Sequence, residues 1–123
     1  MLSDEVRVVV VEDDPDASET LKELLEINGY AVRTASDAVS AMQLIQAYRP
    51  TCVLLDLGLP DTADGLAVAA WLQVRFGPTV IVVVVTGTNR LDDLEAARMA
   101  GADYVLNKPI DIDRLNEILM PMR

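Results

Sequence analysis

Acidic residues follow two apolar runs of the chain. Residues Glu12–Asp14 come directly after the run Val6–Val11, and Asp56 comes directly after the run Cys52–Leu55. If these carboxylates meet, they repel one another unless a cation lies between them. Mg²⁺ suits such a site, because it takes oxygen ligands and is commonly held by one or two carboxylates together with substrate phosphate oxygens.

A hydroxyl group and an ammonium group end two further apolar runs. Thr86 follows Val80–Val85, and Lys108 follows Asn107 after the run Tyr104–Leu106. Each polar residue alone has an ordinary explanation: a strand exit with a helix cap for the acidic triplet, a turn for Asp56, a loop residue for Thr86 and a solvated charge for Lys108. The combination at four run ends is much more specific than its members.

The apolar runs have the length and composition of strands. They are short and rich in β-branched residues, and longer segments with helical spacing separate them. The five expected strands are Val6–Val11, Ala31–Thr34, Cys52–Leu55, Val80–Val85 and Tyr104–Leu106. Strands this apolar favour a parallel sheet with helices on both faces, so the expected fold class is doubly wound α/β. Such sheets bind ligands at the carboxyl ends of their strands, where the polar residues lie.

The expected first helix has clear start and stop signals. Asp14 is a good N-cap residue, Pro15 suits the first helical position, and Asn28-Gly29 closes the segment. The apolar stripe expected to cover the sheet consists of Ala17, Leu21, Leu24 and Leu25. Further helices are expected over about residues 36–48, 65–76 and 91–100, and from about residue 111 onward.

Length and charge limit the possible functions. The 123 residues fit one domain, so a single domain is expected over residues 1–123. Twenty acidic residues against ten basic ones give a formal net charge of −10, which disfavours direct nucleic-acid binding. The lone cysteine, Cys52, has no intrachain disulfide partner and suits a reducing cytoplasm. The first residues do not form a secretory signal, and no apolar run approaches the roughly 20 residues of a membrane span, so a soluble cytoplasmic protein is expected.

The sequence resembles the response-regulator receiver family over essentially its whole length. The matching segments are VVVVEDDP at positions 8–15, VLLDLGLP at 53–60 with Asp64-Gly65 after it, VVVTG at 83–87 and AGADYVLNKP at 100–109. Taken together these motifs are highly specific. The resemblance implies two-component signal transduction and a flavodoxin-like sheet of five parallel strands, in the order 2-1-3-4-5, with five helices.

The resemblance also implies a magnesium site. Asp56 would be the phosphoacceptor and a metal ligand, Asp13 a direct ligand, and Glu12 a carboxylate that acts on the metal through water. The main-chain carbonyl of Gly58 would complete the protein's share of the ligands. Asp14 lies beside the acidic pair and is better explained as the helix cap.

Two further residues would act on the phosphoryl group. By the same resemblance, the Thr86 hydroxyl would hydrogen-bond the bound phosphoryl group and Lys108 would pair with one of its oxygens. Phosphoryl transfer depends mainly on positioning and charge neutralisation, which these residue types supply.

The implied phosphoryl donor is a phosphohistidine on a sensor histidine kinase or a histidine phosphotransfer protein. The chain contains no histidine, so a partner must bring the phosphate. The domain would catalyse only its own phosphorylation and dephosphorylation, and in that sense would not be an enzyme. Phosphorylation would switch the surface around the fourth helix and fifth strand, which a downstream output domain or protein would recognise.

Two positions depart from the family pattern. The loop between Pro60 and Gly65 is one residue longer than the commonest form. The family's switch position in the last strand, usually Tyr or Phe, is Val105, and the nearby Tyr104 belongs to the opposite strand face. The switch is therefore expected to act through Thr86–Asn89 and the start of the fourth helix, without an aromatic swing.

Other functions suit the sequence less well. A flavin-binding module would need Ser/Thr chemistry after the first strand, where three acids lie. A haloacid-type phosphatase would need a second Asp at the position of Gly58, and no phosphate-binding loop motif is present for a nucleotide hydrolase. A purely structural pseudo-receiver would be expected to lose Asp56 or Lys108, and both are retained.

Overall fold

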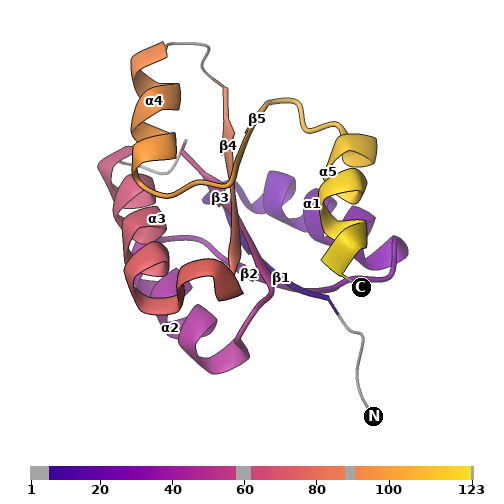
Figure 1. The fold of residues 1–123 in the computed structure, drawn as a ribbon. Coiled ribbons are helices and arrows are strands. Elements are labelled where there is room, and N and C mark those ends of the chain that lie inside the picture. The colour runs from indigo at the N-terminus through magenta and orange to yellow at the C-terminus, as the bar shows by residue number, and fades with distance from the viewer. Residues whose placement is uncertain (1–5, 58–61, 88–90, 123) are drawn as a thin grey trace.

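Strands and helices alternate along the part of the chain that the structure describes (Figure 1). The computed structural model describes residues 6–57, 62–87 and 91–122, with only the backbone for residues 62–64. The strands are β1 (Arg7–Val11), β2 (Ala31–Ala35), β3 (Cys52–Asp56), β4 (Ile81–Thr86) and β5 (Tyr104–Asn107). The α-helices are α1 (Pro15–Ile27), α2 (Ala38–Tyr48), α3 (Thr62–Phe76), α4 (Leu91–Met99) and α5 (Ile112–Leu119), and short 3₁₀ helices cover Gly77–Thr79 and Met120–Met122.

The five strands form one parallel sheet in the order β2-β1-β3-β4-β5. Val8 of β1 is paired with Val32 on one side and with Cys52 on the other, so the strand order reverses between β1 and β3. The expected fold class and strand order are both confirmed. The carboxyl ends of all five strands meet at one edge, where such sheets bind their ligands.

Two apolar layers enclose the sheet. Alternate residues of β1 point to opposite faces, so Val9 packs in one layer and Val8 in the other. Helices α2, α3 and α4 cover the first face, and α1 and α5 cover the second (Figure 1). Both layers are buried, which holds the strand ends in fixed positions. In the described part of the chain, no helix combines the length and apolar character that crossing a membrane requires.

Side-chain caps set the helix starts. The Asp14 side chain accepts a hydrogen bond from the Asp16 backbone N–H, which confirms Asp14 as the cap of α1. The expected start of α2 near Ser36 is wrong, because Asp37 caps this helix by accepting from the Ser40 N–H at 2.7 Å. Helix α2 therefore begins at Ala38.

Helix α3 also begins away from its expected start, at Thr62 rather than at Gly65. The glycine serves a different purpose from a helix boundary. A Cβ atom added at Gly65 would lie 3.1 Å from Leu57 Cδ2, so glycine lets the helix approach the end of β3 closely.

The expected apolar stripe of α1 is only partly correct. Leu25 is buried and Leu21 packs against the core, but Ala17 is exposed and Leu24 is 40% exposed. The buried polar residue Ser18 occupies part of the inward face instead. Ala17 and Leu24 line a groove beside the strand ends.

Candidate functional site

The polar residues predicted at the strand ends do meet at one edge of the sheet. Glu12 follows β1, Asp56 ends β3, and Thr86 ends β4. These three side chains are buried, with exposed fractions of 8%, 4% and 2% respectively. Asp13 follows Glu12 and is exposed, and Lys108 follows β5. Gly58, the fourth proposed metal ligand, lies outside the described residues.

The carboxylates form a compact group. One oxygen from each of Glu12, Asp13 and Asp56 lies within 4.8 Å of the others. Asp14 has a separate role as the cap of α1, and its own N–H donates to Glu12 Oε2 at 3.3 Å. Three carboxylate oxygens at this spacing are the hard donor set that Mg²⁺ prefers. The residues present therefore fit the implied metal.

Lys108 joins two of these carboxylates. Its Nζ atom lies 2.8 Å from Asp56 Oδ2 and 3.4 Å from Glu12 Oε1. Burial lowers the pKa of Lys108, but the hydrogen bond and charge of Asp56, aided by Glu12, outweigh burial and leave the pKa above its ordinary value. The ammonium group is therefore charged at neutral pH.

The pKa of Glu12 is raised by burial and by the neighbouring negative charge. Burial raises its pKa, and the hydrogen bond and negative charge of Asp56 raise it further, to about 7. Lys108 lowers the pKa of Glu12 only in part. The site thus favours an additional positive charge, either a proton or a metal ion.

Backbone hydrogen bonds hold the strand ends together. The Lys108 N–H donates to the Thr86 carbonyl at 2.9 Å, and the Leu57 N–H donates to the Val85 carbonyl at 2.9 Å. The Thr86 hydroxyl and the Lys108 ammonium therefore come from adjacent, hydrogen-bonded strands. Most of the expected switch loop after Thr86, including Asn89, lies outside the described residues.

Successive residues of β5 point to opposite faces of the sheet. Val105 is partly buried against the core beneath α2, α3 and α4. Tyr104 is 38% exposed, and the Arg114 guanidinium of α5 lies 5.8 Å from the centre of its ring. The structure thus confirms that the only aromatic residue of β5 lies on the strand face away from Val105.

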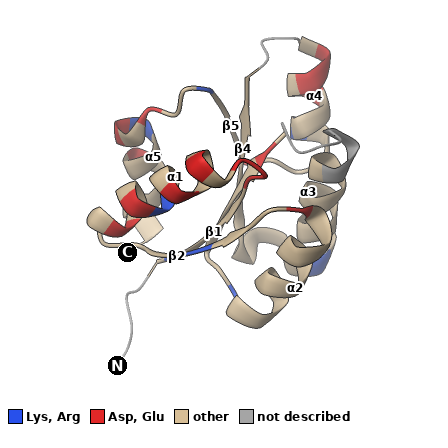
Figure 2. Cartoon of the chain, turned by 180° about the vertical axis from the view of Figure 1, so that it is seen from behind, with Lys and Arg blue, Asp and Glu red and all other residues tan. Residues whose placement is uncertain are grey.

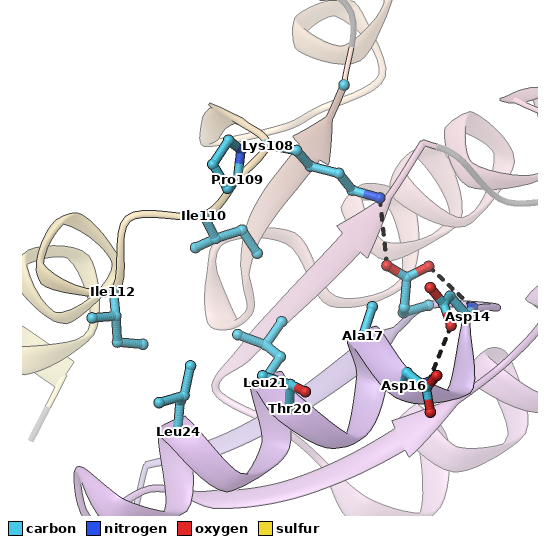
Figure 3. Close-up of a pocket in the computed structure, with 12 residues that line it drawn as sticks. Asp14, Asp16, Ala17, Thr20, Leu21, Leu24, Lys108, Pro109, Ile110 and Ile112 are labelled. Atoms are coloured by element: carbon cyan, nitrogen blue, oxygen red, sulfur yellow. Dashed lines mark hydrogen bonds and ion pairs between the residues drawn. The ribbon is translucent and has the colours of Figure 1, made fainter.

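A groove of about 770 Å³ opens beside the site, between α1 and the segment from β5 to α5. Figure 3 shows the side chains of Leu21, Leu24, Ile110 and Ile112 along its apolar part, with Lys108 and Asp14 near the other end. The sequence interpretation missed this groove. Its signal was the excess of apolar residues on α1, which one sheet-facing stripe cannot bury.

The comparison with known families identifies the domain. The model of the response regulator receiver domain matches residues 8–120. The chain belongs to the response regulator receiver family. It is therefore a receiver domain of two-component signalling, as the sequence motifs predicted.

Relatives of this receiver domain include a longer regulator. Response regulator MprA from Mycobacterium sp. (strain KMS) is 39% identical over 118 residues, which are 96% of this chain and 49% of MprA. The chain thus spans about half the length of the curated relatives it matches.

Solved receiver structures have the same fold. The receiver domain from Methylobacillus flagellatus has a TM-score of 0.84 and 34% identity, covering 97% of this chain and 99% of that one. The receiver domain protein from Methanospirillum hungatei has a TM-score of 0.84 and 28% identity, covering 96% and 94% of the two chains.

Proposed function

We propose that residues 1–123 form a single receiver domain that accepts a phosphoryl group on Asp56 in the presence of Mg²⁺. The observation that carries this proposal is the position of Asp56, a buried carboxylate that pairs with Lys108 and lies beside two other carboxylates. Burying an unpaired carboxylate would lower the stability of the fold. The positive charge of Lys108 offsets this cost and would also stabilise the charged oxygens of a phosphoryl group that Asp56 attacks.

Asp56, Asp13 and Glu12 would hold the metal, Glu12 through water, with the Gly58 carbonyl as a further ligand. A bound Mg²⁺ supplies positive charge against the phosphoryl oxygens. An oxygen of Asp56 attacks phosphorus, and the bond from phosphorus to the donor's nitrogen breaks. The electron pair leaves with the donor imidazole, and an acyl phosphate forms on Asp56.

Lys108 and Thr86 would stabilise the transferred group. The Lys108 ammonium, which pairs with Asp56 Oδ2, would reach an oxygen of the phosphoryl group whose phosphorus is bonded to that carboxylate. The Thr86 hydroxyl would donate to another phosphoryl oxygen. A hydrogen bond from the Lys108 backbone N–H to the Thr86 carbonyl holds the backbones of these two residues side by side at the site.

The donor would be a phosphohistidine of a sensor histidine kinase or a histidine phosphotransfer protein. The groove between α1 and the start of α5 supports this, because its apolar part could bury a partner's side chains while its polar end opens at Lys108. The domain would catalyse only its own phosphorylation and dephosphorylation. It would act in the cytoplasm.

Phosphorylation would change the surface around α4 and β5. The movement of the Thr86 hydroxyl toward the phosphoryl group would shift the segment that leads into α4. A downstream output domain or protein would bind one of the two states more tightly, which is what converts the charge into a signal.

Phosphoramidate tests this function without an identified partner, because its phosphorus–nitrogen bond mimics that of phosphohistidine. With Mg²⁺, intact-mass measurement should show one phosphoryl group per chain, which EDTA prevents and hydroxylamine removes. A folded protein that stays unmodified at saturating Mg²⁺ would favour a pseudo-receiver instead.

A further inference from the structure

Helices α2 and α3 present a nearly uncharged surface on a strongly acidic chain. The α2–α3 face is defined here by the exposed residues Val39, Gln43, Gln46 and Ala47 of α2 and Ala70 and Val74 of α3. Among the described exposed side chains of these two helices, Arg75 alone is charged. Figure 2 shows the contrast with α1, α4 and α5, each of which carries several acidic residues.

The α2–α3 face is made of apolar, small and uncharged polar side chains. Val39 is 67% exposed and Val74 is 89% exposed, so two branched apolar side chains stand in water. Ala47 and Ala70 are small and would let another helix approach closely. The two helices lie side by side over the same layer of the core, which gives the face continuity.

Charges at the ends of this face have both signs. Asp37 is exposed at the amino end of α2, and Arg49 is exposed at its carboxyl end. Arg49 lies over the ring of Phe76, the last residue of α3, which directly follows Arg75 in the sequence. Within the described residues, neither arginine has a carboxylate at ion-pair distance.

The charges at the two ends of the α2–α3 face indicate which kind of partner it binds. A wholly acidic partner would meet Asp37, and a wholly basic partner would meet Arg49 and Arg75. A surface with both signs at opposite ends can instead complement itself, as a twofold interface requires. A second copy turned about such an axis could bring Arg49 of one protomer toward Asp37 of its partner.

Helices α1 and α4 are less suited than the α2–α3 face to a contact between two copies. Helix α1 carries Asp16, Glu19, Glu23 and Glu26, and α4 carries Asp92, Asp93 and Glu95. Contact through either helix would bring like charges together in a chain of net charge −10. Contact through the α2–α3 face leaves α1 on the far side of each sheet.

We infer that the α2–α3 face binds a second copy of this chain in a twofold dimer. Helices of 11 and 15 residues are about 16 and 22 Å long and pack about 10 Å apart, so each copy offers roughly 400 Å². The total, roughly 800 Å², is below the roughly 1,200 Å² of stable specific interfaces and is in the range of weak, transient contacts. The dimer is therefore weak and reversible.

Sedimentation velocity of the whole chain over ~10 µM to ~1 mM tests the dimer, since weak association appears only at high concentration. The average sedimentation coefficient should rise with concentration. V74E places a carboxylate in the interface and should weaken association at least about tenfold. I27E is the matched control, because Ile27 is 80% exposed on α1, and it should behave like the wild type.

Cross-linking locates the interface independently. Gln43 lies near the middle of exposed α2, close to the expected axis, so Q43C should form a disulfide-linked dimer under mild oxidation. I27C should not, and the native Cys52 is buried and does not interfere. A chain that stays monomeric at all concentrations, or a dimer that V74E leaves unchanged, overturns the inference.

Discussion

The ammonium group of Lys108 lies 2.8 Å from the carboxylate of Asp56, and the two residues come from the ends of β5 and β3. The same ammonium reaches Glu12, at the end of β1, at 3.4 Å. One cation thus offsets repulsion between two buried acids. This relationship links the stability of the sheet edge to the chemistry proposed for it.

Replacing Lys108 should therefore affect both stability and phosphorylation. K108M leaves Asp56 buried without its ammonium partner. The free energy of unfolding without Mg²⁺ should fall by about 1 kcal/mol, a modest loss because the Lys108 side chain is 40% exposed. The rate of phosphorylation by acetyl phosphate should fall about 10²-fold, because one stabiliser of the phosphoryl oxygens is lost.

K22M is the matched control for this experiment. Lys22 also pairs with a carboxylate, that of Glu26 at 3.0 Å, but it lies on the surface of α1. This variant should keep the wild-type phosphorylation rate. Equal rates for K108M and the wild type would remove Lys108 from the proposed mechanism.

The raised pKa of Glu12 predicts a pH dependence of Mg²⁺ binding. Its pKa is 4.5 when unperturbed and about 7 in the folded site. The stabilisation from protonated Glu12 is fully present below pH 4.5 and is lost as pH rises through about 7. Mg²⁺ prefers the ionised carboxylate, so its effect on the melting temperature should increase between about pH 5 and about pH 8.

Calorimetry adds a direct readout of this coupling. Near pH 7, Mg²⁺ binding should release protons, so the apparent enthalpy should depend on the ionisation enthalpy of the buffer. E12Q should largely abolish this dependence. A buffer-independent enthalpy for the wild type would contradict the coupling between Glu12 and the metal.

The sequence predicted the fold closely because the strands are strongly apolar and punctuated by clear turn signals. Each expected strand is present, with ends that differ by one residue. The predicted start of α2 was wrong because the spacing of apolar residues does not show that Asp37 caps the helix by accepting a hydrogen bond from the Ser40 N–H. The burial of Leu24 was also mispredicted, because a groove, and not the sheet, lies beneath that side of α1.

The residue types of the site and the repulsion among its carboxylates were predicted, but the raised pKa of Glu12 was not. The positions of Asp56, Glu12 and Lys108 at strand ends follow from the parallel sheet. The raised pKa of Glu12 depends on burial and on the distance to Asp56, and neither can be read from the sequence. The α2–α3 face likewise becomes visible only when the helix positions show which side chains are exposed.

Tyr104 should not take part in the phosphorylation switch. Its ring lies beside Arg114, whereas Val105 faces the other layer of the core. Y104A should therefore give the same beryllofluoride-induced NMR shift changes in α4 as the wild type, while T86V should reduce them. A beryllofluoride-bound structure with the Tyr104 ring behind Thr86 would refute this prediction.

Cys52 should be unreactive in the folded protein. Its side chain is fully buried in β3, and burial, with the charge of Asp103, raises the thiol pKa well above its ordinary value. A thiol reagent such as dithionitrobenzoate should label Cys52 only after denaturant unfolds the chain. Rapid stoichiometric labelling of the native protein would show that the sheet opens far more readily than its packing implies.

The most direct test of the central claim is the intact mass of wild type and D56N after incubation with acetyl phosphate and Mg²⁺. The wild type should gain one phosphoryl group, and D56N should gain none, because an amide is a poor nucleophile. D14N retains the helix cap and should be phosphorylated like the wild type. A phosphoryl group on D56N in wild-type yield would contradict the assignment of Asp56 as the acceptor.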